Sequence, residues 1–393
     1  MSPKQAMHTG PQHSERLAIH RLEHERPVTP EKINAFLAGR SFPLIEGPTV
    51  TFVWRGTADE VRLQHWIYGL TTQQEFRRIE ETDLWFLVME LPPRSRVEYK
   101  LLVTHGDRTR LIEDSLNPQK ARDPFGANSV ATGEGYENPE WINPDSESRP
   151  GTVEELIIKS QALGQTRHCQ IYLPARFRQT RRYPLLIVHD GGDFLRFTAM
   201  KTVLDNLIHR LELPEMVVVF ENPQNRLQEY ANDERHARFL AEELIPKLER
   251  GYPLIAEPRG RGLLGASFGA VASLSAAYRY PSTFGRLMLL SGSFAFTDIG
   301  RHNHRGPLFD PIVQFVNQFR SDPRRLAERL FVACGQYESL IYENRSLVPL
   351  LQTTGMEIKY VEARDGHNWE NWRDRLREGM SYLFPGPLWL VYE

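Results

Sequence analysis

The stretch GLLGASFGAVASLSAAYRYP, residues 262–281, decides the fold class of this chain. It begins with a short apolar run, passes through the motif GASFG at 265–269, and continues into an alanine-rich segment that ends at Pro281. A G-x-S-x-G motif between a strand and a helix is typical of a nucleophile elbow, where small residues permit a tight, strained turn. The turn holds the serine at a helix N-terminus, where N–H groups favour developing negative charge. The sequence therefore predicts Ser267 as a catalytic nucleophile.

Further apolar runs extend this pattern into an α/β domain with a mostly parallel sheet. They are rich in Val, Ile and Leu, which is typical of strands buried on both faces. The runs are LLIVHD (185–190), MVVVFE (216–221), RLMLLSG (286–292), RLFVACG (329–335) and EIKYVEA (357–363). Residues 234–250 carry an apolar stripe at helical spacing, so strands and helices alternate. Two earlier segments, 154–160 and 168–174, are predicted to form an antiparallel pair at the sheet edge.

The N-terminal half has a different period. Val50, Phe52 and Trp54 alternate with other residues in VTFVW, and the same period of two recurs at 84–88 and 97–103. Several short alternating strands separated by turn residues predict an antiparallel β-sandwich.

These patterns predict five regions along the chain. The predicted regions are an N-terminal extension with a short helix (1–39), a β-sandwich domain (40–132), a linker (133–152), an α/β-hydrolase catalytic domain (153–385) and a C-terminal tail (386–393). The linker is assigned because GEGYENPEWINPDSESRPGT contains three prolines and several acids but no periodicity.

Composition excludes several classes of protein. The 393 residues include 48 Lys and Arg against 50 Asp and Glu, a net charge of −2, so the chain lacks the overall basic footprint of a nucleic-acid-binding protein. It has no apolar stretch of about 18 residues and no apolar signal segment near its start, so we expect no membrane association. Cys169 and Cys334 cannot build a disulfide framework, which fits a reducing, cytoplasmic compartment. The oligomeric state stays open.

A serine nucleophile needs a base, and the base needs an orienting acid. His367 lies in DGHNW, just after the last predicted strand, and is the predicted base. The loop GQYES at 335–339 follows the preceding strand and contributes Glu338 as the predicted acid. Asp365, two residues before the histidine, is an alternative acid, and a Ser-His dyad without an acid is a third possibility.

The oxyanion hole needs two N–H donors. The first is predicted at Phe268, the residue after the nucleophile. The second is predicted in the loop HDGGDF at 189–194, where Gly191 or Gly192 would let the backbone approach a substrate oxygen closely. The sequence does not decide between these two glycines.

The motifs together resemble the enterochelin esterase family, α/β-hydrolases related to esterase D. The resemblance rests on GASFGA, HDGGDF, NRLQEYANDERHARFLAEELIP, CGQYES and DGHNWENWRDRL, and in the N-terminal half on VTFVWRG, TDLW and DSLNP. It implies an early-set β-sandwich before the hydrolase domain and hydrolysis of iron-loaded catecholate siderophores in the cytoplasm. It supports Ser267, His367 and Glu338 in their predicted roles. The His-rich start and the ending FPGPLWLVYE have no counterpart in the family.

A ferric catecholate is anionic and aromatic, so arginines and aromatic faces are expected near the serine. Arg226 and Tyr230 follow the strand at 216–221, on the sheet edge where sites form. Trp369 and Trp372 follow His367 in the sequence. These four are the predicted substrate-binding residues, although ion pairing for the arginine and core packing for the tryptophans are equally compatible with the sequence.

The predicted chemistry requires no cofactor and no metal. No HExxH, GxxxxGK[ST] or post-strand GxGxxG motif occurs in the sequence. The predicted partner is a small-molecule ester, without nucleic acid. Two other functions remain possible at this stage: an esterase for acyl or feruloyl esters of carbohydrates, and a non-catalytic glycan-binding module. The sequence also leaves hydrolysis and acyl transfer undistinguished.

Overall fold

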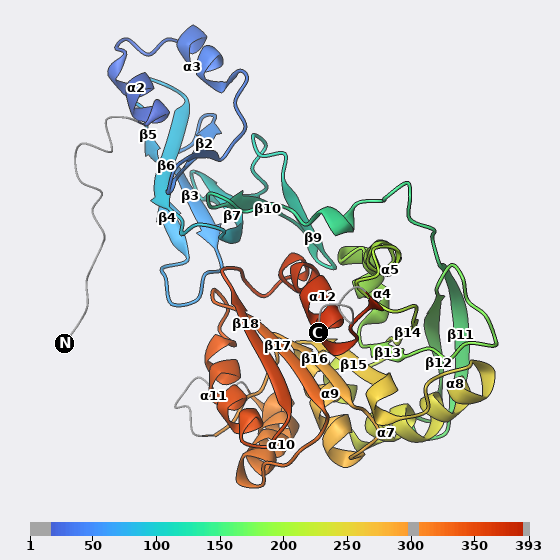
Figure 1. Ribbon diagram of the computed structural model, residues 1–393. Coiled ribbons are helices and arrows are strands. Elements are labelled where there is room, and N and C mark those ends of the chain that lie inside the picture. The colour runs from blue at the N-terminus through green and yellow to red at the C-terminus, as the bar shows by residue number, and fades with distance from the viewer. Residues whose placement is uncertain (1–16, 298–305, 388–393) are drawn as a thin grey trace. The chain divides into compact units, whose positions relative to one another are not determined.

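The computed structural model describes residues 17–297 and 306–387, and the chain divides into two compact units between Glu137 and Asn138 (Figure 1). The first part of the predicted N-terminal extension and most of the predicted tail at 386–393 lie outside the described residues. Each unit has its own sheets and its own core.

Unit 1 consists of two antiparallel sheets and two short helices. One sheet has the order β1-β2-β6-β5, and the other has the order β4-β3-β7-β10-β9 with β8 paired to β7. The elements are α2 (Ala18–His24), α3 (Pro30–Leu37), β1 (Leu44–Glu46), β2 (Thr49–Arg55), β3 (Glu60–His65), β4 (Gln73–Glu75), β5 (Arg77–Arg78), β6 (Leu84–Glu90), β7 (Arg96–His105), β8 (Arg108–Ile112), β9 (Lys120–Asp123) and β10 (Gly126–Thr132). The predicted antiparallel N-terminal sheets are confirmed.

Strand β2 is buried on both faces, which explains why its alternation is weak. On one face Phe52 meets Tyr99 of β7 edge-to-face, with ring centroids 4.9 Å apart, so the two sheets pack against each other. On the other face Val53 joins Ile33 and Phe36 of α3 in a separate apolar cluster. Helices thus cover the outer face of this sheet, and both faces of β2 are apolar.

The core of unit 1 contains a buried polar group at the start of DSLNP. The Tyr99 hydroxyl donates to Asp114 Oδ2 at 2.6 Å and accepts from Asn117 Nδ2 at 3.0 Å. Burial raises the pKa of Asp114, although the Tyr99 hydrogen bond acts in the opposite direction. The tyrosine is therefore needed to satisfy a carboxyl group that is removed from water.

Tyr99→Phe should destabilise unit 1 by about 1–3 kcal/mol, because it leaves the buried Asp114 oxygen without this donor. The measurement is urea denaturation followed by a probe of unit 1. Tyr68→Phe is the control, since Tyr68 is 45% exposed and its hydroxyl can be hydrated. Equal midpoints for both variants would contradict the prediction.

Unit 2 contains an eight-stranded sheet in the order β11-β12-β14-β13-β15-β16-β17-β18. Strands β13 to β18 are parallel, and β11 and β12 form the predicted antiparallel edge. The strands are β11 (Thr152–Ser160), β12 (Gln165–Leu173), β13 (Leu185–Val188), β14 (Val217–Phe220), β15 (Arg261–Ala266), β16 (Arg286–Leu290), β17 (Arg329–Gly335) and β18 (Glu357–Ala363). The predicted mostly parallel sheet is confirmed.

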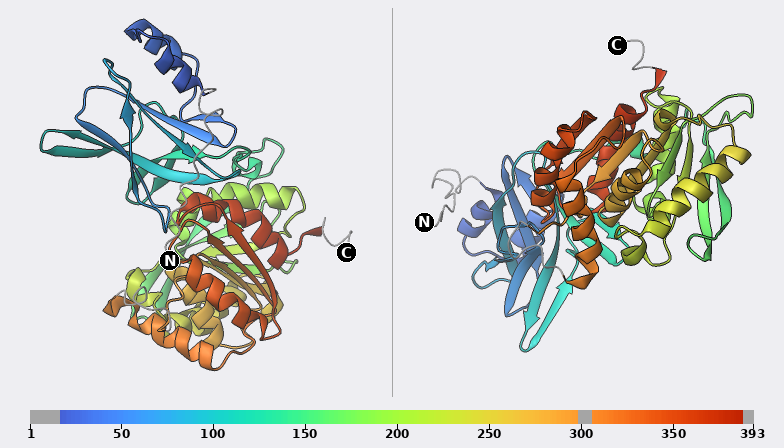
Figure 2. Two further views of the ribbon diagram at one scale, coloured as in Figure 1. Left: turned by 90° about the vertical axis from the view of Figure 1, so that its left-hand side faces the viewer. Right: turned by 90° about the horizontal axis from the view of Figure 1, so that it is seen from below.

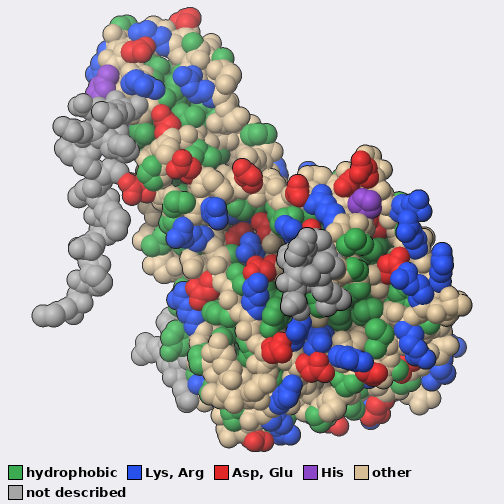
Figure 3. Space-filling view, viewed as in Figure 1, with side chains coloured by type: hydrophobic (Ala, Val, Ile, Leu, Met, Phe, Trp, Pro, Cys, Tyr) green, Lys and Arg blue, Asp and Glu red, His purple; other side chains and the backbone are tan. Residues whose placement is uncertain are grey.

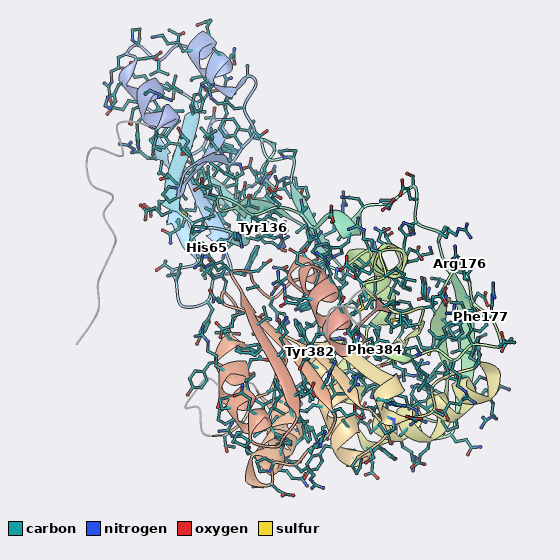
Figure 4. The ribbon with its side chains drawn as sticks, in the orientation of Figure 1. His65, Tyr136, Arg176, Phe177, Tyr382 and Phe384 are labelled. Atoms are coloured by element: carbon teal, nitrogen blue, oxygen red, sulfur yellow. The ribbon has the colours of Figure 1, made fainter. Side chains whose placement is uncertain are left out.

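Helices cover both faces of this sheet (Figure 2). The helices are α4 (Gly191–Phe197), α5 (Met200–His209), α6 (Arg226–Glu229), α7 (Glu234–Arg238), α8 (Ile245–Gly251), α9 (Phe268–Arg279), α10 (Asp310–Ser321), α11 (Ile341–Gln352) and α12 (Trp369–Leu383), with short turns η1 (Glu140–Ile142), η3 (Pro258–Gly260) and η5 (Pro307–Phe309). Ile187 of β13 packs into the apolar cluster that includes α9, whereas Leu186 and Val188 pack into the cluster that includes α5 and α12. Phe384, labelled in Figure 4, closes the second cluster against Gly262.

The segment predicted as one amphipathic helix at 234–250 is helical but irregular. Between α7 and α8 lies a π-helical turn, η2 (Phe239–Leu244). Pro246 is the second residue of α8, and its missing N–H removes one intrahelical hydrogen bond, which is a known cause of such irregularity.

Part of the stretch predicted as a linker packs on unit 2. Asn206 of α5 donates to the carbonyls of Trp141 and Asn143, both at 2.8 Å. On the face seen in Figure 3, Lys and Arg side chains lie among Asp and Glu side chains on both units. In the described part of the chain, each helix falls short of the length or the apolar character that crossing a bilayer requires.

Candidate active site

Ser267 occupies a strained turn between β15 and α9. Its backbone has φ 57° and ψ −118°, a left-handed conformation that a non-glycine residue adopts only under constraint. Gly265 is required here, because a Cβ at this position would lie 2.1 Å from the Gly269 carbonyl oxygen. The Ser267 N–H donates to the Leu290 carbonyl of β16 at 2.9 Å. The local geometry is that of a nucleophile elbow.

His367 follows β18 and precedes α12. Asn368 caps α12 by accepting from the Asn371 N–H at 2.9 Å. Asp365 Oδ1 accepts from the Gly366 N–H at 2.7 Å and from Asn368 Nδ2 at 2.8 Å. Asp365 therefore shapes the turn that presents His367, and its carboxylate is engaged with that turn.

Glu338 contacts the histidine directly. Its Oε2 lies 2.5 Å from His367 Nδ1, while its Oε1 accepts from Ser291 Oγ at 2.6 Å and from the Gly335 N–H at 2.7 Å. The Glu338 side chain is 2% exposed and the His367 side chain is 37% exposed. Burial opposes ionisation, but His367, Ser291 and Gly335 together hold the pKa of Glu338 below its ordinary value.

Ser267 and His367, the predicted nucleophile and base, lie at the same edge of the sheet, because parallel strands β15, β17 and β18 all end there. Ser267 Oγ is 3.2 Å from Ser293 Oγ. In the described part of the chain, the Ser267 hydroxyl thus contacts Ser293 and makes no hydrogen bond to His367. Hydrogen bonds between a nucleophile and its base are often long or poorly aligned before substrate binds.

The oxyanion-hole candidates differ in what their N–H groups already do. Phe268 opens α9, so its N–H points out of the first helical turn without an intrahelical acceptor. The Gly191 N–H donates to the Glu221 carbonyl at 2.9 Å, and the Gly192 N–H donates to the Asn222 side chain at 2.8 Å. A side-chain amide can move away more easily than strand backbone, so the geometry favours Gly192.

Gly191 has a separate packing reason to be glycine. A Cβ at this position would lie 2.3 Å from Cβ of Phe220. The glycine pair in HDGGDF therefore combines a packing requirement at Gly191 with an accessible N–H at Gly192.

Arg226 is held in an ion pair. Its guanidinium makes hydrogen bonds of 2.8 to 2.9 Å to both oxygens of Asp190 and lies over the Phe268 ring at 5.9 Å. The side chain is 36% exposed, so one side of it faces solvent. Of the roles that the sequence allows for Arg226, the structure thus shows the ion pair.

Tyr230 does not fit its predicted role in substrate binding. It is fully buried, its hydroxyl donates to Glu221 at 2.7 Å, and it accepts from the Asp190 N–H at 3.0 Å. Helix α6 is a single turn, and the residue that follows it turns into the core. We therefore correct the prediction: Tyr230 is a core residue.

The two tryptophans play different parts. Trp372 is buried, donates from Nε1 to Ser291 Oγ at 3.0 Å, and meets the His367 ring edge-to-face at 5.1 Å. Trp369 is half-buried and packs against Trp372 and Phe197. Trp372 thus packs against His367, the predicted base, whereas Trp369 keeps part of its ring accessible.

Sequence reasoning missed the serine that binds Glu338 and a buried polar cluster. Glu221 Oε1 accepts from His189 at 2.7 Å, from His236 at 3.0 Å and from Tyr230 at 2.7 Å, and Oε2 is 3.7 Å from the Arg167 guanidinium. These histidines and Glu221 are close enough to hold a metal ion. One Glu221 oxygen already accepts from three donors, whereas the other oxygen and His189 Nε2 have no hydrogen-bond partner among the described residues. The nearby Arg167 cation disfavours a second positive charge at this place.

The fold and the site define an α/β-hydrolase with a serine elbow and a histidine–carboxylate pair. Residues 160–383 match the family described as "Putative esterase", and residues 49–141 match the N-terminal domain of enterochelin esterases. The chain therefore belongs to the enterochelin esterase family, and it is a carboxylic ester hydrolase.

Known relatives agree with this family. The iron(III) enterobactin esterase of Escherichia coli O6:H1 is 25% identical over 373 residues, which span 85% of this chain and 91% of the relative. The enterobactin esterase of Shigella flexneri, crystallised in the presence of enterobactin, has a TM-score of 0.70 at 23% identity and covers 88% of this chain and 94% of that chain. The endo-1,4-beta-xylanase/feruloyl esterase of Xylanibacter ruminicola is 22% identical over 60% of this chain and 31% of its own length.

Glu338→Gln should lower kcat by about 10²- to 10⁴-fold, because the neutral amide no longer stabilises an imidazolium. The measurement is hydrolysis of p-nitrophenyl acetate at neutral pH. Asp365→Asn is the matched control: it keeps an acceptor for the Gly366 N–H and should cost less than about tenfold. A larger loss of kcat in Asp365→Asn than in Glu338→Gln would mean that Asp365, not Glu338, is the acid.

Proposed function

We propose that this chain is a serine esterase that hydrolyses ester bonds of a ferric catecholate siderophore and thereby releases iron. The observation that carries the proposal is the Glu338–His367 pair at the sheet edge where Ser267 sits in its elbow. The substrate class is supported by the relatives, because the iron(III) enterobactin esterase of Escherichia coli O6:H1 aligns over both units. The feruloyl esterase relative aligns over a smaller part of the chain.

The first half of the reaction forms an acyl-enzyme. With Nδ1 of His367 bonded to Glu338, Nε2 is left to accept the Ser267 hydroxyl proton. Ser267 Oγ leaves Ser293 and attacks the ester carbonyl carbon, and the carbonyl oxygen becomes an oxyanion. Collapse of this intermediate breaks the ester C–O bond, and His367 returns the proton to the departing alcohol.

The second half repeats the steps with water. His367 takes a proton from water, the hydroxide attacks the acyl carbon, and Ser267 leaves with the proton that His367 returns. The products are a carboxylic acid and the free enzyme. In a siderophore whose catecholates are joined through esters, each cycle opens one link of the chelating scaffold.

The oxyanion is stabilised in this proposal by Phe268 N–H and Gly192 N–H. The helix N-terminus at Phe268 adds a favourable dipole. Release of Gly192 from Asn222 is a small rearrangement of one side chain, and it makes a second donor available when substrate binds.

The anionic substrate is bound by Trp369 and the solvent-facing side of Arg226 in this proposal. Because Arg226 is already paired with Asp190, its attraction for a trianionic ligand is reduced, and it contributes orientation more than affinity.

We place the reaction in the cytoplasm. Cys169 and Cys334 are both free thiols and buried, which is compatible with a reducing compartment. Iron released by ester cleavage is directly available there.

The experiment compares three esters with wild type and Ser267→Ala: a ferric tri-catecholate trilactone, p-nitrophenyl acetate and a feruloyl sugar ester. We expect fast turnover of the siderophore, measured by chromatography of its products, and a loss of at least about 10³-fold in Ser267→Ala. Ser275→Ala is the control, since this hydroxyl is buried in α9 and bonds to the Ala272 carbonyl at 3.3 Å. Turnover of the feruloyl or acetyl ester alone would keep the mechanism and reject the siderophore.

A further inference from the structure

The turn Ser291-Gly292-Ser293 after β16 lies between the elbow and the acid. Ser291 is fully buried, and its N–H donates to the Ala333 carbonyl of β17 at 2.7 Å. Ser293 contacts Ser267 through both hydroxyls at 3.2 Å. The carbonyl of Gly292 accepts from the buried Asn344 side chain at 2.9 Å. Both ends of the turn therefore touch the proposed catalytic residues.

The hydroxyl of Ser291 has a defined direction. Trp372 Nε1 can only donate, and an ionised Glu338 can only accept. With Trp372 Nε1 at 3.0 Å and Glu338 Oε1 at 2.6 Å, the Ser291 proton must point at Glu338. A chain of hydrogen bonds thus runs from Trp372 through Ser291 to Glu338 and on to His367.

The backbone at Ser291 is unfavourable for a residue with a side chain. Its φ is 46°, in the left-handed region that favours glycine, and such a residue costs about 1–3 kcal/mol. Glycine would remove that strain. The serine occupies a strained position, and its hydroxyl makes two hydrogen bonds to groups of the site.

We propose that Ser291 is a positioning residue that fixes the carboxylate of Glu338 against His367, with Trp372 directing its hydroxyl. This inference rests on the proposed function for its kinetic consequences. Ser291 and the Gly335 N–H engage Oε1, which leaves Oε2 as the atom that faces Nδ1 of the histidine. A buried carboxylate held at three points cannot rotate out of line with the imidazole. The same donors help to keep the pKa of Glu338 below its ordinary value despite its burial.

The test is a double-mutant cycle with Ser291→Ala, Glu338→Ala and the combined variant, assayed on p-nitrophenyl acetate. Ser291→Ala should lower kcat by about 10- to 100-fold with KM changed less than about twofold, because ground-state binding does not involve this hydroxyl. In the Glu338→Ala background the serine has nothing to position, so the combined variant should be no slower than Glu338→Ala. Losses that multiply would mean a general structural role and would overturn the proposal.

A second readout does not depend on turnover. The proton shared by His367 Nδ1 and Glu338 gives a low-field ¹H NMR signal, which should shift or broaden in Ser291→Ala and stay in place in the control Ser275→Ala. An unchanged signal in Ser291→Ala would reject the proposal. If the wild type shows no Ser267-dependent hydrolysis, the proposed function fails while this signal still tests Ser291.

If Ser291→Ala does not fold, Trp372→Phe is the variant used to test the proposal. It keeps an aromatic ring beside His367 but removes the donor that directs the Ser291 hydroxyl. We expect a smaller loss in kcat, about 3- to 10-fold, which disappears in the Glu338→Ala background. An equal loss in both backgrounds would contradict the proposal that Trp372 acts on Glu338 through the Ser291 hydroxyl.

Discussion

Two backbone hydrogen bonds at the carboxyl end of β16 hold the proposed catalytic residues together. The Ser267 N–H reaches the Leu290 carbonyl at 2.9 Å, and the Ser291 N–H reaches the Ala333 carbonyl at 2.7 Å. Strand β16 lies between β15 and β17, so these bonds tie the nucleophile elbow and the strand leading to Glu338 to one central strand. A shift of one residue in this register would turn every side chain to the opposite face of the sheet. The geometry of the site therefore depends first on strand pairing.

The same strand ends store backbone strain. Ser267 and Ser291 both adopt left-handed conformations, with φ values of 57° and 46°. Each costs about 1–3 kcal/mol, which a flexible loop would release. Here the turns follow strands whose side chains are buried on both faces, and the packed sheet imposes their conformation. Strain is compatible with the fold because the core on either side of the sheet is large, and the result is two hydroxyls held in fixed directions.

The sequence was sufficient for the sheet, since long apolar runs allow few alternatives. It also predicts Ser267 and His367 as a catalytic pair, since each lies in a local motif, and these roles stay predictions. It failed at Tyr230, because α6 has a single turn and too little periodicity to indicate which way a side chain faces. It also missed Ser291. That residue is 47 positions from Glu338 and 81 from Trp372, and only the register of the parallel sheet brings the three together. Motifs thus indicate candidate catalytic residues, whereas contacts between residues far apart in the sequence emerge only from the tertiary structure.

The buried polar cluster behind the elbow has a comparable role in rigidity. Glu221 is taken from water at high cost, and hydrogen bonds from His189, His236 and Tyr230, together with the nearby Arg167 cation, offset that cost. Tyr230 also accepts from the Asp190 N–H, and Asp190 in turn holds Arg226 over the ring of Phe268, the proposed first oxyanion donor. Removing one member of such a network leaves a buried charge without its partner, at about 3–5 kcal/mol. An apolar core of the same volume could be equally stable, but it would not fix the position of the loop that carries Gly192, the proposed second oxyanion donor.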